Sequence, residues 1–169
     1  MRFIGFCGET DVRRLAFTIC VALLSCALFA GSAIAAEPRL DETEISLLRE
    51  IPYREGASKQ WTLDLAMPKE RGDKPRAAIV VIHGGGWLEG DKSSFSTTTN
   101  RMPGNILDFA RLGFVAVTIN YRLSGEAPFP AALVDCRCAV RWLRANADTY
   151  QIDRARVGAY GNSAGGHLV

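Results

Sequence analysis

Residues 155–165 read Ala-Arg-Val-Gly-Ala-Tyr-Gly-Asn-Ser-Ala-Gly, and this stretch decides the fold. Its first six residues favour a strand, and the pattern Gly-x-Ser-x-Gly after a strand is typical of a sharp turn into a helix. Gly161 and Gly165 stand two residues either side of Ser163, where a side chain would clash with the neighbouring strand or helix. We therefore interpret Ser163 as a candidate nucleophile, and the Ala164 N–H at the helix N-terminus as a candidate oxyanion donor. The alternative is a glycine-rich turn with an inert serine.

A second glycine motif, His83-Gly84-Gly85-Gly86-Trp87, lies upstream of that turn and directly follows the apolar run Ala77–Ile82. Three successive glycines allow the backbone to turn sharply and to come close to a ligand. They also leave main-chain N–H groups free to point at an anion. The motif therefore predicts an oxyanion loop at the end of a buried strand, with a flexible turn as the alternative.

The rest of the chain alternates between strand and helix patterns. Runs of β-branched and apolar residues predict strands, and apolar residues at i+3 and i+4 predict helices. The expected strands cover residues 48–53, 61–66, 77–82, 114–119 and 155–160, the first two as an antiparallel pair, and the expected helices cover 105–112 and 130–147. Residues 37–47 are charged and mixed, and we expect a linker or pro-region there. The alternation predicts an α/β fold with a mostly parallel, doubly wound sheet.

The N-terminal 36 residues have the pattern of a secretory signal peptide. Arg13 and Arg14 precede an uncharged run, Leu15–Ala36, that ends in small residues. A basic start, an apolar stretch and an Ala-x-Ala-like end are typical of a cleaved signal, which predicts a mature chain of residues 37–169 that is periplasmic or extracellular. The alternative is an uncleaved membrane anchor, because the run is long enough to span a bilayer.

Composition and charge argue against nucleic-acid binding, and the cysteine pattern argues against a zinc site. The chain has 169 residues, 48% of them hydrophobic, and a net charge of +2 from 20 basic and 18 acidic residues. This balance offers no electrostatic case for binding nucleic acid, and it leaves the signal segment as the only expected membrane contact. Cys136 and Cys138 are too close along a helix to face each other, and no second pair or nearby histidine completes a zinc site. We expect no metal and no organic cofactor.

These motifs together resemble the hormone-sensitive-lipase-like carboxylesterase group of the α/β-hydrolases, and within it the branch similar to bacterial feruloyl and acetylxylan esterases. The similarity runs from about Ile45 to the last residue. It rests on the segments Leu63–Leu65, Ile82–Trp87, Gly90–Lys92, Ile119–Ser124, Phe129–Ala132, Asp135–Cys136, Val140–Arg144 and Gly161–Leu168. The resemblance implies an α/β-hydrolase fold and a secreted serine carboxylesterase that acts on small-molecule or polysaccharide esters.

The resemblance also implies a role for each motif residue. Ser163 would attack the ester carbonyl and form an acyl-enzyme, with the oxyanion hole made by the N–H groups of Gly85, Gly86 and Ala164. The oxyanion loop would be supported by His83, Gly84 and Trp87, and positioned by Tyr121 and Arg122. His167 lies one helical turn after Ser163, and we expect it to point away from the site rather than to act as the base.

The sequence departs from the family pattern after the nucleophile. A catalytic acid and then a histidine are expected to follow the serine, but only Ala164, Gly165, Gly166, His167, Leu168 and Val169 come after Ser163. We therefore expect a fragment, cut just after the nucleophile elbow, that is inactive by itself. Two alternatives stay open: a formamidase or peptidase of the same fold, and a degenerate hydrolase fold without catalysis.

Overall fold

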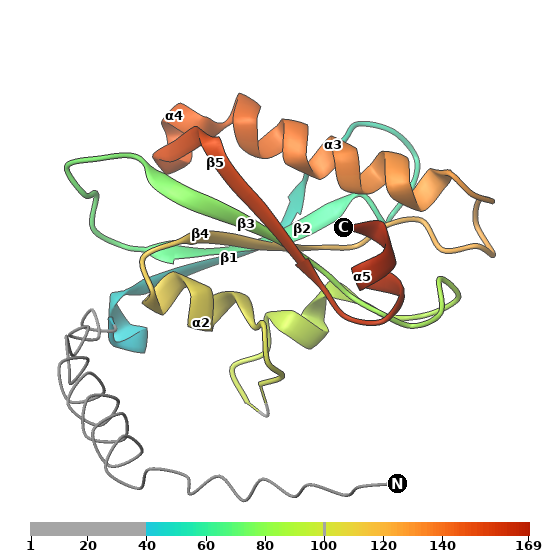
Figure 1. Cartoon of the computed structure of the whole chain (residues 1–169), viewed down its shortest axis with the longest axis horizontal. Coiled ribbons are helices and arrows are strands. Elements are labelled where there is room, and N and C mark those ends of the chain that lie inside the picture. The colour runs from blue at the N-terminus through green and yellow to red at the C-terminus, as the bar shows by residue number, and fades with distance from the viewer. Residues whose placement is uncertain (1–39, 100) are drawn as a thin grey trace, which may run out of the picture. The chain divides into compact units, whose positions relative to one another are not determined.

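A five-stranded sheet organises the described part of the chain, residues 40–99 and 101–169 of a computed structural model (Figure 1). The spatial order is β1 (Ile45–Pro52), β2 (Thr62–Pro68), β4 (Val115–Ile119), β3 (Arg76–Ile82) and β5 (Ile152–Gly161). Strand β3 runs parallel to both of its neighbours, β4 and β5, whereas β1 pairs antiparallel with β2, and β2 with β4. All five expected strands are therefore confirmed. The predicted signal peptide, residues 1–36, lies outside the described residues.

The central strands form where the sequence is most continuously apolar. Every residue of β4 is buried, and Val80 of β3 pairs with Val117 of β4 on one side and with Ala159 of β5 on the other. A strand between two neighbours, with helices on both faces, has no polar side. This explains the uninterrupted run of β-branched residues Ile79–Ile82 in β3. The same strand order places the ends of β3, β4 and β5 side by side.

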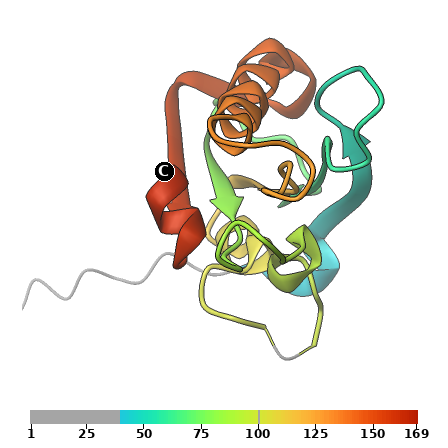
Figure 2. The ribbon, with the colours of Figure 1, turned by 90° about the vertical axis from the view of Figure 1, so that its right-hand side faces the viewer.

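Helices cover both faces of this sheet (Figures 1 and 2). On one face α2 (Ile106–Arg111) packs over β2 and β4, and it starts at Asn105, whose side chain accepts a hydrogen bond from Leu107 N. On the other face α3 (Ala131–Ala145) buries Ala139 and Leu143 against the strands. Short helices η2 (Glu42–Glu44), η3 (Lys92–Phe95), α4 (Ala147–Tyr150) and α5 (Ala164–Leu168) complete the described elements.

Several boundaries differ from the sequence prediction, and polar side chains explain two of them. The expected linker over 37–47 is wrong at its end, because a turn capped by Asp41 precedes strand β1, which begins at Ile45. The long helix expected from Pro130 to about Ala147 is interrupted at Asn146, whose side-chain amide donates to Trp142 O and ends α3. In both places a polar side chain bonded to nearby backbone sets the boundary, which hydrophobic periodicity does not report.

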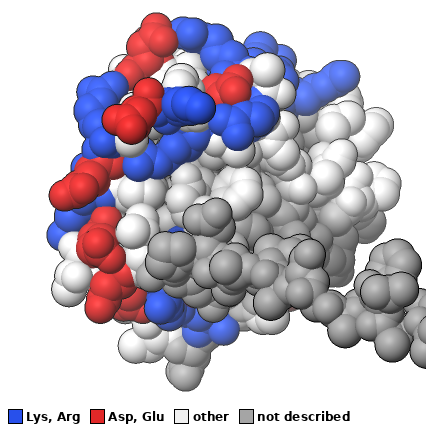
Figure 3. Space-filling model, turned by 60° about the vertical axis from the view of Figure 1, so that its left-hand side comes forward, with Lys and Arg blue, Asp and Glu red and all other residues white. Residues whose placement is uncertain are grey.

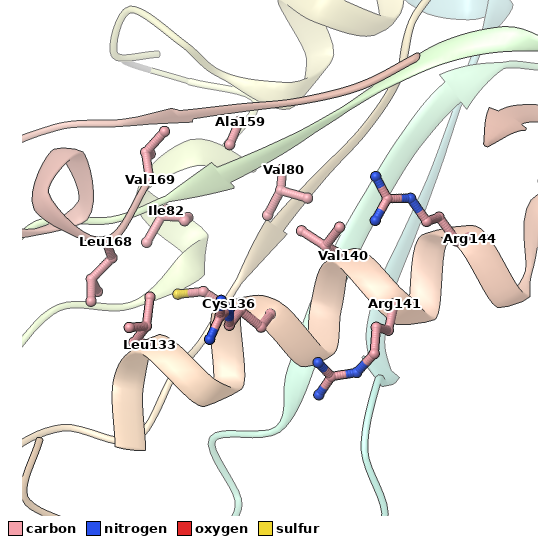
Figure 4. Close-up of a pocket in the computed structure, with 11 residues that line it drawn as sticks. Val80, Ile82, Leu133, Cys136, Val140, Arg141, Arg144, Ala159, Leu168 and Val169 are labelled. Carbon is pink, nitrogen blue, oxygen red and sulfur yellow. The ribbon is translucent and has the colours of Figure 1, made fainter. Parts of the chain in front are cut away.

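A groove of about 450 Å³ lies between α3, the strands β3 and β5, and the end of α5 (Figure 4). Val80 and Ile82 of β3 and Val140 of α3 contribute apolar side chains, and Arg141 and Arg144 lie along its α3 side. Among the described residues that line it, none belongs to the triglycine loop or to the turn at Ser163. This groove is therefore separate from the candidate active site.

The described surface carries charges of both signs. Figure 3 shows one face on which Lys and Arg side chains intermingle with Asp and Glu. Arg154 and Arg156 form exposed ion pairs with Asp148 and Asp153. Within residues 40–99 and 101–169, every helix falls short of the length and hydrophobicity that crossing a membrane requires.

Candidate active site

Ser163 occupies a strained turn between strand β5 and helix α5. Its φ of 50° and ψ of −121° belong to a region that residues with a side chain rarely adopt, and such a conformation typically costs about 1–3 kcal/mol. The surrounding backbone holds this turn, since Gly165 N donates to Asn162 O at 2.8 Å and His167 N donates to Ser163 O at 3.2 Å. The turn connects strand to helix as the sequence predicts.

The two flanking glycines are required by backbone contacts. A Cβ on Gly165 would lie 2.1 Å from the Ile82 carbonyl oxygen, and a Cβ on Gly161 would lie 2.4 Å from the Gly165 carbonyl. These neighbours are main-chain atoms, so a flexible side chain cannot move aside to make room. The glycines therefore allow α5 to start directly against the end of β3.

The triglycine loop closes tightly on itself after β3. Gly85 has φ +113° and its carbonyl oxygen accepts hydrogen bonds from Leu88 N and Glu89 N at 3.0 and 3.1 Å. A Cβ on Gly85 would lie 2.0 Å from the Glu89 carbonyl oxygen, whereas the space beside Gly86 is open within 4 Å. Gly86 nevertheless has φ +60°, so glycine is favoured there by backbone conformation rather than by crowding.

The loop and the turn meet at the end of the sheet. A Cβ on Gly84 would lie 3.2 Å from Ser163 Cβ and 3.0 Å from Asn162 O. The contact arises because β3 and β5 are parallel neighbours and the two motifs follow their last residues, Ile82 and Gly161. The structure therefore brings together two motifs that are far apart in the sequence.

His83 is buried at the base of the loop and is not free to act as a base. Its ring stacks on Tyr121 with centroids 4.4 Å apart, and the Tyr121 hydroxyl donates to His83 O at 3.0 Å. Burial lowers the pKa of His83, and the hydrogen bond to the Gly84 carbonyl and the charge of Asp91 oppose this only in part. The neutral ring donates from Nδ1 to Gly84 O at 2.7 Å, since a carbonyl oxygen only accepts.

His167 lies apart from His83, against the last residue of the loop motif. Its ring meets Trp87 edge-on with centroids 5.3 Å apart. The two side chains line a recess of about 280 Å³, together with the aromatic ring of Phe129 and the side chains of Arg122 and Leu168. Phe129 is 75% exposed and Trp87 40% exposed, so the loop side of the site has an apolar rim.

Arg122 is fixed by a buried carboxylate on α3. Its guanidinium donates from Nε and from one terminal nitrogen to the two oxygens of Asp135, both at 2.8 Å, and its backbone N–H donates to the same side chain at 3.0 Å. Asp135 is fully buried and also accepts from Arg54. The segment after β4 is thereby tied to α3.

The polar residues that hold the far end of the loop belong to the segments of family resemblance, but the sequence alone assigned them no role. Asp91 and Lys92 follow the loop, and Asn120 follows β4. The Asn120 side chain accepts a hydrogen bond from Lys92 N and donates one to the Asp91 carboxylate. The signal of Asn120 in the sequence is a polar residue directly after a buried strand. Within the described residues, no group of three or more His, Cys, Asp or Glu side chains is placed to hold a metal ion. Cys136 and Cys138 are free thiols.

Comparison with known proteins agrees with this architecture. The BD-FAE family model matches residues 63–169. The chain is 30% identical over 106 residues to Esterase LipC of Mycobacterium tuberculosis, over 63% of this chain and 25% of that protein. It is 37% identical over 106 residues to arylacetamide deacetylase of Oryctolagus cuniculus, over 60% of this chain and 25% of that protein.

Among solved structures, a truncated form of a carbohydrate esterase from gut microbiota matches with a TM-score of 0.62 and 30% identity, over 78% of this chain and 44% of that one. The chain thus spans about a quarter of the length of the curated relatives it matches. The family match extends over more than half of the chain and includes both glycine motifs. The chain belongs to the BD-FAE family, within the hormone-sensitive-lipase-like carboxylesterases of the α/β-hydrolase fold.

Proposed function

We propose that this chain supplies the nucleophile and the oxyanion hole of a serine carboxylesterase. Ser163 Oγ attacks the ester carbonyl, and the backbone N–H groups of Gly85, Gly86 and Ala164 stabilise the negative oxygen of the tetrahedral intermediate. The ester C–O bond then breaks, the alcohol leaves with the serine proton, and an acyl-enzyme remains. One observation carries the proposal: Gly84 of the oxyanion loop lies against the Ser163 turn. Loop and nucleophile therefore occupy one site, as acyl transfer requires.

The roles of the remaining residues follow from their contacts. His83 and Trp87 brace the loop, His83 through its stacking on Tyr121 and Trp87 through its carbonyl, which accepts from Ser124 N at 2.7 Å. The recess beside Trp87 is lined mainly by apolar and aromatic side chains and would hold an apolar or aromatic substituent of the ester. Neither His83, which is buried, nor His167, which packs on Trp87, is proposed as the base.

The proposal includes the substrate class and the compartment. Similarity to a carbohydrate esterase supports an ester of a carbohydrate as substrate. Acetyl or feruloyl esters of plant polysaccharide are proposed from the family resemblance of the motifs. Residues 1–36 are proposed to be a signal peptide that directs export to the periplasm or medium, on the basis of Arg13, Arg14 and the uncharged run after them. N-terminal sequencing of the exported protein tests this: a start at Ala36 or Glu37 supports the proposal, and retention of Met1 in the membrane contradicts it.

Similarity to arylacetamide deacetylase supports a second candidate, cleavage of an amide by the same serine. The two candidates are separated by comparing acetylated xylan and methyl ferulate with acetanilide and N-formylkynurenine. A higher kcat/KM on the esters supports the carboxylesterase, and a higher kcat/KM on the amides supports the second candidate.

The serine mechanism is tested with Ser163→Ala in the gene product purified from its native host. Hydrolysis of p-nitrophenyl acetate should fall to background, because loss of a nucleophilic serine removes catalysis by several orders of magnitude. Ser58→Ala is the matched control, since Ser58 lies in the β1–β2 loop and bonds only locally to Gln60 N. The 169-residue chain should show at most background turnover, because His83 is buried and the ring of His167 packs on Trp87, so neither is assigned as the base. Full activity of the Ser163→Ala protein would refute the proposal.

A further inference from the structure

Consecutive residues at the end of strand β4 hold both ends of the loop that starts at His83. The first end is held by Tyr121, which stacks on the His83 ring and donates its hydroxyl to His83 O. The second end is held by Asn120, whose Oδ1 accepts from Lys92 N at 2.6 Å and whose Nδ2 donates to Asp91 Oδ2 at 2.8 Å. Strand β4 is the neighbour of β3 opposite to the one that carries Ser163.

Asn120 is itself fixed from every side. Its N–H donates to Thr62 O at 3.0 Å, and its carbonyl oxygen accepts from the Tyr53 hydroxyl at 2.7 Å. With its side-chain amide also bonded at both ends, the residue is 7% exposed and has no free rotation. Asn120 thus transmits the position of β4 to the loop.

The residues it holds are fixed in turn. Burial disfavours the ionised form of Asp91, but hydrogen bonds from Asn120 and Ser93 outweigh this and place the pKa of Asp91 below its usual value. The Lys92 ammonium, 4% exposed, pairs with Glu50 and lies 3.5 Å from Asp64 Oδ1. An ionised Asp91 accepts hydrogen bonds only, which assigns Nδ2 of Asn120 as the donor.

We propose that Asn120 and Asp91 form a clamp that positions the oxyanion loop relative to Ser163. Asn120 is a positioning residue: it touches neither substrate nor nucleophile, and it acts through Asp91 and Lys92. The catalytic meaning of the clamp rests on the proposed function, whereas its mechanical effect on the loop does not.

The geometry provides a test by exchange of donor and acceptor. In Asn120→Asp, two carboxylates face each other, and in Asp91→Asn a single side-chain oxygen has to serve both Ser93 N and the Asn120 amide. In the double variant Asn120→Asp/Asp91→Asn every hydrogen bond is restored, because the residue at 91 keeps an oxygen for Ser93 N and donates its NH₂ to the carboxylate at 120. Loss of a charge-assisted hydrogen bond in each single variant should therefore be reversed in the double variant.

The readout is backbone amide hydrogen exchange, measured by NMR on the 169-residue chain at neutral pH. Leu88 N and Glu89 N report on loop closure without touching the clamp, since both donate to Gly85 O. Arg76 N, which donates to Gln151 O at the opposite end of β3, is the remote control. In each single variant, exchange at the two loop amides should accelerate at least about tenfold relative to the control amide. In the double variant it should return to within about twofold of the unmodified chain.

Two results would overturn the clamp. One is unchanged loop exchange in both single variants; the other is a double variant as fast as the singles. If Asn120→Asp fails to fold, Asp91→Asn and the double variant still decide the question through the same amides. Failure of the proposed serine mechanism is a separate outcome. It would appear as full hydrolysis by the Ser163→Ala protein, and it would leave the hydrogen-exchange result for the clamp unchanged.

Discussion

Asp135→Asn tests how much the buried carboxylate on α3 contributes to holding the segment after β4. Asp135 is fully buried and accepts four hydrogen bonds: three from Arg122 and one from Arg54. An asparagine offers a single oxygen and turns an NH₂ group toward one of the guanidinium donors. The substitution therefore removes the charge and leaves donors without an acceptor.

The magnitude follows from the burial of the partners. Removing one member of a buried ion pair typically costs about 3–5 kcal/mol. Here the Arg122 and Arg54 side chains keep 20% and 34% exposure, so water partly replaces the lost acceptor and the lower end, about 3 kcal/mol, applies. With a urea slope of about 1–3 kcal/mol/M, the unfolding midpoint should fall by about 1–3 M.

Urea unfolding followed by tryptophan fluorescence measures this effect, because the Arg54 guanidinium lies over the Trp61 ring at 4.1 Å. Asp148→Asn is the matched control: it removes the same charge from an ion pair with Arg154 in which Asp148 is 87% exposed, and its midpoint should not change measurably. If Asp135→Asn lowers the midpoint no further than Asp148→Asn, the buried pair does not stabilise the fold and the reasoning is wrong.

Three further predictions concern the site and its surroundings. Gly165→Ala should lower the urea midpoint much more than Gly166→Ala, because the first places a methyl group 2.1 Å from the Ile82 carbonyl oxygen and the second 3.2 Å from that of Gly161; equal midpoints would contradict the role given to the elbow glycines. Burial holds the pKa of His83 below 6.5, so the unfolded chain gains a proton that the folded chain does not. The free energy of unfolding should therefore fall between about pH 7.5 and pH 5.5, and a His83→Phe variant that loses as much would exclude this cause. Burial raises the pKa of Cys136 to about 12, so iodoacetamide at pH 8 should leave Cys136 unmodified in the folded protein while the half-buried Cys138 reacts, as peptide mass mapping can check.

Local patterns were sufficient for the strands and for the two glycine motifs. The run 77–82 is apolar throughout and ends in four β-branched residues, and the run 114–119 is apolar except for Thr118. Such runs suit strands buried on both faces, and the structure has β3 and β4 there. The serine turn was recognisable because its glycines stand at fixed positions two residues either side of Ser163, although the neighbour that requires glycine at 165 is the distant Ile82 carbonyl. Information of this kind is present in a short window of sequence.

Contacts between distant segments were not predictable in the same way. Glu50 has φ 56° at an irregularity in β1, and its N–H donates to Asp64 Oδ1, a bond that depends on the pairing of two strands. The Asn120–Asp91 bond depends on strand order in the same sense. The sequence also does not reveal why each loop position needs glycine: Gly85 is excluded from substitution by crowding, and Gly86 by its backbone angle alone.

The position of β3 between β4 and β5 has a consequence for the time at which the site forms. Val80 pairs with Val117 and with Ala159, so the loop after β3 obtains its clamp and its serine only after two long crossovers have closed. Parallel pairing of this kind requires loop closure before any contact compensates for the lost chain entropy, which makes it a slow step in folding. A newly made chain therefore passes through an interval in which the apolar edges of β3 and β4 are open to other chains, and a chaperone would have most effect in that interval.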